Sequence, residues 1–486
     1  MVVSRRASLS YLDHPPLAFW IAHAVATLAG SENRVLLRAP FIVLFAGTTW
    51  LTYRLGARLF GERAGAFAAL LLNLAPVFTL STGGWILPDG PLDLALVAAT
   101  LALSHVLLEP NPPRALHWWV AAGAATAVAF LSKYHAVFLV AGTLGFLLTR
   151  REARPWLRRR EPYLAAAVAL VGFVPVLVWN ARHQFVSFRF QGGRAAGHGL
   201  HLGAMAQNLA GQAAYLLPWI WLLLLWEFVR AVRAGRRDAR RWLLASLGAG
   251  PVIIFTCISL GGNPGLPHWP APGYLLLFPL AGDVLARWES RGRRARAAVR
   301  LGLVASGMVL VLLTGVAASQ VATGWLTAAR PRWFARGDPS LEAVDWTELR
   351  DQLDARGLLT GPHPVVAAAH WIDAAKLGYA LGPRVAVLCL SDDPRHFQFV
   401  WPPMDYLGRD VLLLARLDGG HGGGSDRATE SGHARESEDE ATRVSARFAP
   451  LFSSIAPAET VAVHRNGRSV VRLLAFRAFR MRRAGE

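Results

Sequence analysis

Charged side chains and cysteine are both scarce in this sequence. Asp, Glu, Lys and Arg make up 17% of the 486 residues, against about 25% in soluble domains. Lysine occurs only at Lys133 and Lys376, so arginine carries almost all of the positive charge. The two cysteines, Cys257 and Cys389, cannot form a disulfide framework. These shortages disfavour an ordinary soluble enzyme and a small secreted domain.

Apolar residues, by contrast, account for 53% of the chain, which excludes a disordered protein. Apolar stretches long enough to cross a hydrocarbon core recur throughout residues 34–321. We therefore expect a polytopic α-helical membrane protein with a transmembrane domain of about ten spans over this range. The expected spans are 34–55, 63–82, 91–108, 115–131, 136–149, 162–179, 205–229, 242–260, 272–287 and 299–320.

Arginine clusters occupy every second loop between these spans, for example residues 150–160 and 230–241. The positive-inside rule places such loops in the cytoplasm. The net charge of +19 is therefore a topology signal, and we expect no nucleic-acid partner. The alternate loops are rich in Pro, Gly, Trp, His and Asp, and by alternation they face outward together with residues 1–33.

A change in composition near residue 322 predicts a second domain, residues 322–486, which alternation places outside the cytoplasm. Short β-branched runs at 365–369, 385–390 and 411–417 predict strands, and residues 341–358 predict an amphipathic helix. Asn466-Gly467 between apolar runs predicts a hairpin. The Gly-, Ser- and Glu-rich residues near 418–443 predict a disordered loop. The second domain is thus expected to be small and α/β.

Five short motifs stand in the outward-facing segments. They are YLDHPPL at 11–17, LPDGPL at 87–92, SKY at 132–134, the Trp-Asn, Ser-Phe, Gln and Arg positions of 179–194, and PHWPAP at 267–272. In this order they resemble motifs of the bacterial family 39 glycosyltransferases. These belong to the dolichyl-phosphate-mannose protein mannosyltransferase superfamily, which includes the aminoarabinose transferases of lipid A. The resemblance covers about residues 1–290.

The resemblance implies a GT-C fold in the cell's inner membrane and a specific chemistry. Such an enzyme moves a sugar from a polyprenyl-phosphate donor to a hydroxyl acceptor on the outer face by inverting displacement. The acceptor can be a glycan, a lipid or a protein. The reaction needs one carboxylate as base and cationic or hydrogen-bonding groups at the departing phosphate. We expect no cofactor and no metal, because the leaving group is a phosphate monoester.

The resemblance also implies roles for nine residues that lie in or beside the outward loops. We predict Asp89 and Asp13 as catalytic residues; His14, Lys133, Arg189, Arg194 and His268 as ligands of the donor phosphate; and Trp269 and Asp93 as contacts of the sugar or acceptor. Each of these predicted roles has an alternative in which the residue serves the fold or the membrane and takes no part in catalysis or binding. An aspartate at a span start can cap a helix, a lysine or arginine can anchor at lipid headgroups, and a tryptophan can belong to the interfacial aromatic belt.

One departure from the family concerns the expected base. The resemblance implies a first span and an Asp-Glu pair before the Asp-His-Pro-Pro motif, with an aspartate of that pair as base. Here Met1 stands twelve residues before Asp13, and no such pair is present. We expect a misplaced start codon or a truncated gene. The alternative functions are therefore an inactive truncated homologue, which would act as a membrane scaffold, and a transporter or flippase, although no inverted repeat is evident.

Overall fold

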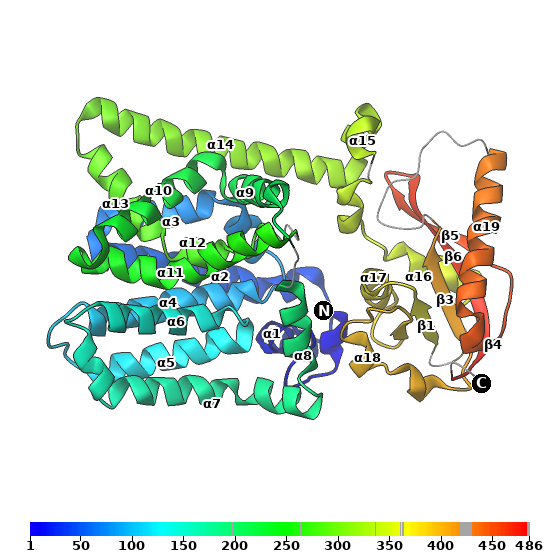
Figure 1. The fold of residues 1–486 in the computed structure, drawn as a ribbon. Coiled ribbons are helices and arrows are strands. Elements are labelled where there is room, and N and C mark those ends of the chain that lie inside the picture. The colour runs from blue at the N-terminus through cyan, green and yellow to red at the C-terminus, as the bar shows by residue number, and fades with distance from the viewer. Residues whose placement is uncertain are drawn as a thin grey trace. The chain divides into compact units, whose positions relative to one another are not determined.

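A computed structural model describes residues 1–195, 199–262, 265–335, 337–359, 361, 364–417 and 430–483. The chain divides into two compact units, residues 7–310 and residues 1–6 with 311–486 (Figure 1). The predicted boundary near 322 lies close to this division. The prediction for residues 1–33 was wrong in two respects, because residues 1–6 pack with the C-terminal unit and residues 17–29 form helix α1.

The first unit contains helices and, among its described residues, no strand. Its α-helices are named in chain order together with α14, which both units share. They are α1 (Leu17–Ala29), α2 (Arg34–Phe60), α3 (Glu62–Leu74), α4 (Asp89–Leu107), α5 (Ala115–Ser132), α6 (Ala136–Thr149), α7 (Glu161–Arg182), α8 (Val186–Ala195), α9 (Leu202–Leu216), α10 (Pro218–Ala234), α11 (Ala239–Ile258), α12 (Ala271–Leu275), α13 (Phe278–Glu289) and α14 (Arg293–Thr323).

Six of the predicted spans are single helices long and apolar enough to cross a membrane, namely α2, α4, α5, α7, α11 and α14. Large apolar side chains on these helices remain exposed, including Val43, Val171 and Leu301, each about two thirds or more exposed. Exposed apolar side chains on helices of this length are what lipid tails cover. The expected polytopic membrane fold is therefore confirmed.

Not all of the ten predicted spans are single long helices. The predicted span at 205–229 is the pair α9 and α10, which are bent by 108° at Leu217. Leu217 has φ of 65° and precedes Pro218, and a residue before proline is sterically disfavoured in a helix. The spans predicted at 63–82, 136–149 and 272–287 contain helices of at most 14 residues. Described helices thus provide six spans, or seven with the bent pair.

Close packing in the helical unit depends on small residues. α5 packs along α7, and α2 packs along α3 and α4 (Figure 1). A Cβ on Gly123 of α5 would lie 2.5 Å from the backbone oxygen of Ala165 in α7, and one on Gly65 would lie 2.4 Å from the oxygen of Tyr53. Small residues let helix backbones approach where no hydrophobic effect separates helix from lipid.

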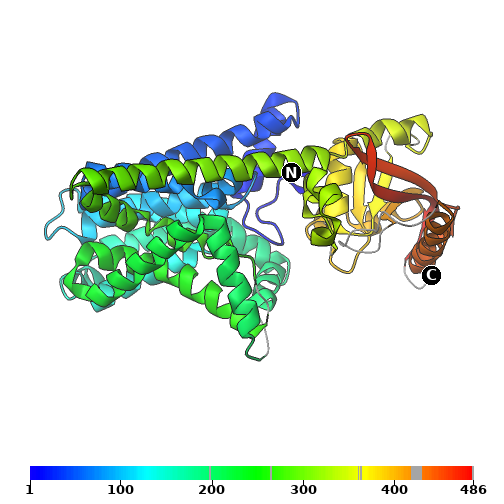
Figure 2. The same cartoon turned by 90° about the horizontal axis from the view of Figure 1, so that it is seen from above.

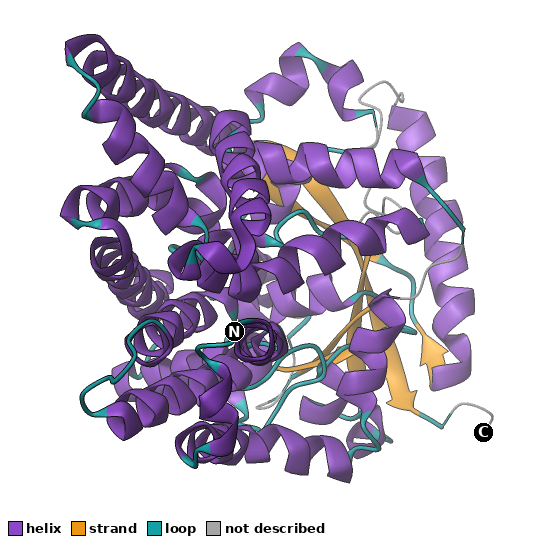
Figure 3. Ribbon diagram, turned by 60° about the vertical axis from the view of Figure 1, so that its left-hand side comes forward, coloured by secondary structure: helices purple, strands orange, loops and turns teal. Residues whose placement is uncertain are grey.

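The second unit contains a six-stranded sheet, and Figure 3 shows strands only there among the described residues. The strand order is β2-β1-β3-β6-β4, with β5 also paired to β6. β1 is parallel to β2 and β3, whereas β6 is antiparallel to β3, β4 and β5. The strands are β1 (Val365–Ala368), β2 (Ala386–Cys389), β3 (Val411–Arg416), β4 (Phe452–Ile455), β5 (Glu459–Arg465) and β6 (Arg468–Met481).

Most predicted strands of this α/β unit are confirmed. The three β-branched runs are β1, β2 and β3, and the β5–β6 hairpin turns at Asn466 and Gly467, whose φ angles of 50° and 74° suit a two-residue hairpin. Strand β4 was not predicted from the sequence. The helix predicted at 341–358 is shorter, because α16 covers only Glu348–Ala355. α16 and α17 (Trp371–Leu381) lie on one face of the sheet and α19 on the other (Figure 2).

The predicted disordered loop at 418–443 was wrong for its second half. Residues 430–443 belong to helix α19 (Glu430–Phe448), while residues 418–429 lie outside the described part of the chain. Val444 and Phe448 on this helix are buried in the core of the unit. Polar composition resembled a linker, but apolar residues four apart lie on one helix face and pack against the core.

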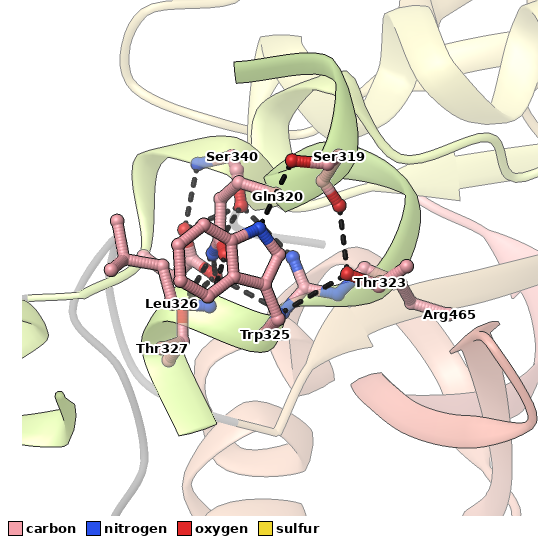
Figure 4. Close-up of polar contacts among 9 residues, drawn as sticks. Ser319, Gln320, Thr323, Trp325, Leu326, Thr327, Ser340 and Arg465 are labelled. Carbon is pink, nitrogen blue, oxygen red and sulfur yellow. Dashed lines mark hydrogen bonds and ion pairs between the residues drawn. The ribbon is translucent and has the colours of Figure 1, made fainter. Parts of the chain in front are cut away.

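A buried polar network stabilises the start of the second unit (Figure 4). Asp338 Oδ2 accepts hydrogen bonds from Thr327 Oγ1 at 2.7 Å and from Gln320 Nε2 and Arg465 Nη2, each at 3.1 Å. Its Oδ1 accepts from the backbone nitrogen of Ser340 at 2.9 Å. The network joins the end of α14 to β5, so a single carboxylate fixes both elements.

Candidate active site

The candidate site is built around a buried ion pair in the helical unit. α4 begins at Asp89, directly after Pro88, and α5 ends at Ser132, directly before Lys133. Lys133 Nζ lies 2.8 Å from Asp89 Oδ1, and both side chains are less than a tenth exposed. The N-cap of α4 is Pro88, with no side-chain capping bond. The Asp89 carboxylate is therefore paired with the Lys133 ammonium at the start of its own helix.

Asp93 lies one turn further along α4 and is 2% exposed. Both of its carboxylate oxygens are buried, and neither meets hydrogen-bond geometry with a described residue. The Thr82 hydroxyl, which donates to the Phe78 backbone oxygen at 3.1 Å, lies close enough to interact with this carboxylate. Burial of an unpaired carboxylate is costly. Carboxylates within membrane helices commonly mark functional sites for this reason. Asp93 is thus an unsatisfied acceptor beside the ion pair.

Histidine and aromatic side chains surround the ion pair. His135 and His268 lie within electrostatic range of Asp89. The His135 ring stacks on Phe255 at 4.5 Å between centroids, and Phe255 meets the ring of Trp269 edge to face at 5.5 Å. Nε2 of His135 is buried without a hydrogen-bond partner among described residues. These rings form a wall that carries at least one free polar atom.

The Asp-His-Pro-Pro segment approaches the same region from the N-terminal side. The backbone oxygen of Asp13 accepts a hydrogen bond from Gln191 Nε2 of α8. Asp13 lies within electrostatic range of Tyr134, and His14 within range of His135. The segment is held locally by a hydrogen bond from the Tyr11 backbone nitrogen to the His14 oxygen, at 3.1 Å.

Two tyrosines beside this segment remain hydrogen-bonding phenols at neutral pH. Burial raises the pKa of Tyr11 to about 12. Burial also raises the pKa of Tyr134, against the opposing effect of its hydrogen bond with Ser187, whose Oγ lies 2.7 Å from the phenol oxygen. Asn180 is fully buried nearby on α7, and its Oδ1 has no hydrogen-bond partner in the described structure. The loop after α5 is therefore lined by polar groups on both sides.

Of the two predicted phosphate-binding arginines, the one whose side chain is described, Arg189, does not join the buried cluster. Arg189 on α8 is exposed, and no side-chain hydrogen bond or ion pair of it is present in the described structure. The side chain of Arg194 lies outside what the structure describes. The structure thus brings seven of the nine predicted residues near one another, namely Asp13, His14, Asp89, Asp93, Lys133, His268 and Trp269.

Three residues of this site, His135, Tyr134 and Asn180, were not predicted from the sequence. Tyr134 and Asn180 belong to motifs that carry the family resemblance, and His135 directly follows one of them, so position in or beside a matching motif was the available signal. The sequence could not reveal that polar atoms of His135 and Asn180 are buried without a hydrogen-bond partner among the described residues.

Among the described residues, no group of three or more His, Cys, Asp or Glu side chains is arranged to hold a metal ion.

Comparison with known proteins bears on the identity of this site. Residues 13–179, which contain the ion pair, match the family model described as dolichyl-phosphate-mannose-protein mannosyltransferase. Lipid A galacturonosyltransferase RgtD of Rhizobium johnstonii is 25% identical over 345 residues, which cover 70% of each chain.

The fold is that of ArnT from Cupriavidus metallidurans. Its apo crystal structure has a TM-score of 0.61 at 16% identity, and the match covers 96% of this chain and 88% of that one. The chain is a glycosyltransferase with the GT-C fold. A second ArnT structure, bound to undecaprenyl phosphate, matches equally well, with a TM-score of 0.61 at 17% identity. The predicted fold class and enzyme class are therefore confirmed for this glycosyltransferase.

Proposed function

We propose that this glycosyltransferase moves a sugar from a polyprenyl-phosphate donor to a hydroxyl acceptor by single, inverting displacement on the outer face of the membrane. The observation that carries the proposal is the buried Asp89–Lys133 pair beside the unsatisfied carboxylate of Asp93. The ArnT structure with bound undecaprenyl phosphate supports this donor class. The name of RgtD supports a glycolipid as the first acceptor to test.

Lys133 is the proposed ligand of the departing phosphate. An ammonium group has three N–H donors, and the contact with Asp89 uses one of them. The others can bind phosphate oxygens, which gain charge as the bond to the sugar breaks. A fixed cation at that position stabilises the transition state without reorganising. His268 and His14 are the proposed additional donors to the phosphate.

The two carboxylates of α4 have different proposed roles. Asp89 is a positioning residue, because it compensates the charge of Lys133 in a buried site and fixes its direction. Asp93, whose oxygens make no hydrogen bond by geometry with a described residue, accepts a hydrogen bond from the acceptor hydroxyl. It takes that proton as the acceptor oxygen bonds to the anomeric carbon and the polyprenyl phosphate leaves. Trp269 supplies the apolar surface on which a sugar ring can stack. Asp13 is proposed to act indirectly on the site, through its electrostatic interaction with Tyr134 in the loop that also carries Lys133.

The outer-face assignment rests on charge. Arginine clusters alternate with the polar loops, and the loops that hold Asp89, Lys133 and His268 are those poor in arginine. The same alternation supports an extracytoplasmic second unit. Accessibility labelling of single cysteines tests it, with Ser391→Cys in the second unit and Arg158→Cys in a basic loop. In intact cells, an impermeant thiol reagent should label the cysteine at position 391 and should not label the one at position 158. Labelling of both cysteines, or of neither, contradicts the topology.

The donor site is tested with the variants Asp89→Asn, Lys133→Met and their combination. Each single change leaves one buried ionisable group uncompensated, which costs about 3–5 kcal/mol when a buried pair is broken. The double change removes both charges and keeps similar volume, so folding should recover. Binding of undecaprenyl phosphate should not recover, because the phosphate ligand is lost.

A matched control is the double change Arg63→Met with Glu289→Gln, which removes an ion pair elsewhere in the same unit. It should leave undecaprenyl phosphate binding unchanged. If the Asp89→Asn, Lys133→Met enzyme binds this lipid and transfers sugar as well as the unmodified protein, the pair is structural only and the proposed donor site is wrong.

A further inference from the structure

A second polar site lies where other helices of the helical unit end. It is a pocket of about 660 Å³ formed by the end of α2, the residue after α6, the turn between α10 and α11, and α13. Cationic side chains dominate its lining. The charged lining residues are Arg58, Arg150, Arg237, Arg240, Arg241, Arg287, Asp238 and Asp283. Six arginines thus face two aspartates.

The inner wall of the pocket is a compensated ion cluster. Arg241 is 7% exposed, and its Nη1 lies 2.7 Å from Glu227 Oε2, a side chain that is fully buried. Arg241 also pairs with Asp283, which in turn lies 3.1 Å from Arg287. Buried guanidinium groups held by several carboxylate contacts have little freedom to move. This wall is therefore a rigid base.

The outer wall carries charge that carboxylates compensate only in part: Arg150 Nε lies 3.3 Å from Glu152 Oε2, whereas Arg237 and Arg240 have no carboxylate partner within the described residues. Arg240 donates to the backbone oxygen of Leu59 at 2.8 Å, and Arg150 donates to that of Arg236. The guanidinium of Arg237 is exposed and has no hydrogen bond or ion pair within the described residues. Backbone oxygens orient a guanidinium but leave its positive charge in place. The outer wall is consequently preorganised for an anion.

We propose that this pocket binds the phosphate group of an anionic phospholipid. Arginine is the side chain best suited to bidentate contact with phosphate oxygens. The pocket lies at the end of α2 and the start of α11, both long enough to span a membrane. Apolar side chains within two residues of its arginines in sequence are exposed, namely Leu148 and Trp288. A ligand with a phosphate head and apolar tails matches both features.

The site is distinct from the proposed donor site. It involves none of the residues around Asp89 and Lys133, and its arginines belong to the basic loops. A general attraction of basic loops to anionic membranes is the competing explanation. It predicts that every exposed arginine on these loops contributes alike. A built pocket predicts instead that the outer-wall arginines contribute far more than their neighbours.

The test uses the full chain purified in a neutral detergent. Native mass spectrometry counts bound phosphatidylglycerol at increasing lipid concentration, with phosphatidylcholine as the neutral comparison. The pocket variants are Arg237→Gln, Arg237→Gln with Arg240→Gln, and the charge-retaining pair Arg237→Lys with Arg240→Lys. The control is Arg293→Gln with Arg294→Gln, two exposed arginines of α14 that do not line the pocket.

Phosphatidylglycerol should bind at least about tenfold more weakly to the double Gln variant, and about threefold more weakly to Arg237→Gln, as expected when charge-assisted contacts are lost. The Lys pair should bind with intermediate affinity, because it keeps the charge but loses the bidentate contact, and the control should bind normally. Equal losses in the control and pocket variants overturn the proposal. So does phosphatidylcholine binding as tightly, or inorganic phosphate displacing the lipid completely at millimolar concentration, which would mark a site for soluble anions.

Discussion

Two buried aspartates, one in each unit, differ in how their oxygens are satisfied. Asp338 accepts hydrogen bonds at both oxygens from Ser340, Thr327 and Arg465 among others (Figure 4). Asp93 has no hydrogen-bond partner at either oxygen within the described chain. A fully satisfied buried network rigidifies a fold, whereas an unsatisfied carboxylate lowers stability. The contrast separates a structural carboxylate from one available to a ligand.

The largest effect is expected from Asp93→Asn. The amide keeps the shape and removes the charge, so the free energy of unfolding should stay constant or rise. Sugar transfer should fall by about 10²–10⁴-fold if the carboxylate takes part in proton transfer. Transfer from a polyprenyl-phosphate sugar to a glycolipid in membranes, with unfolding followed in detergent, measures both. Unchanged transfer in a stable Asp93→Asn protein would remove this residue from the site.

Arg465→Met should show the opposite pattern. It leaves the buried carboxylate of Asp338 without its cation, which should lower the stability of the second unit by about 3–5 kcal/mol. Hydrogen exchange of the β5–β6 hairpin in the full chain measures the loss. Undecaprenyl phosphate binding should be unaffected at temperatures where the unit is folded. Normal exchange protection in this variant would show that the network contributes little.

The sequence predicted Asp93 but not Asp338, and the reason is physical. A carboxylate in an apolar helical segment is conspicuous because burial there is costly, whereas Asp338 stands in an ordinary polar stretch. Its cation, Arg465, is 127 residues away, and single-sequence patterns do not reveal such pairings. Apolar length similarly predicted where helices run but not the 108° bend at Leu217. Local sequence patterns therefore predict where helices and strands form, whereas contacts between distant residues determine where a helix bends and which side chains pair.

The pH dependence of the second unit provides a smaller test. Hydrogen bonds from Ser340 and Thr327 and the Arg465 contact outweigh burial and lower the pKa of Asp338. The folded state therefore binds this proton less readily than the unfolded chain, whose pKa is about 3.9. Stability from this group should be complete above that pKa and lost as pH falls below it. Hydrogen exchange of the β5–β6 hairpin between pH 6 and 3 should show a shallower acid loss in Asp338→Asn than in the unmodified protein. Identical slopes would contradict the assignment.

The smallest effect is expected at the border of the candidate site, where a satisfied contact stands next to the unsatisfied ones. Tyr134→Phe removes the hydrogen bond between the phenol and Ser187 Oγ, which spans 2.7 Å. A net loss of about 0.5–1.5 kcal/mol is typical of one such bond. Ser187→Ala should cost a similar amount, and the double variant little more than either single one, because both remove the same bond. Denaturation in detergent measures the stability of all three variants, and strictly additive losses would show that the two hydroxyls are not coupled.

Because this bond belongs to the loop that carries Lys133, sugar transfer in the three variants should fall far less than in Asp93→Asn. A Tyr134→Phe enzyme as inactive as Asp93→Asn would instead place the phenol among the groups that contact substrate.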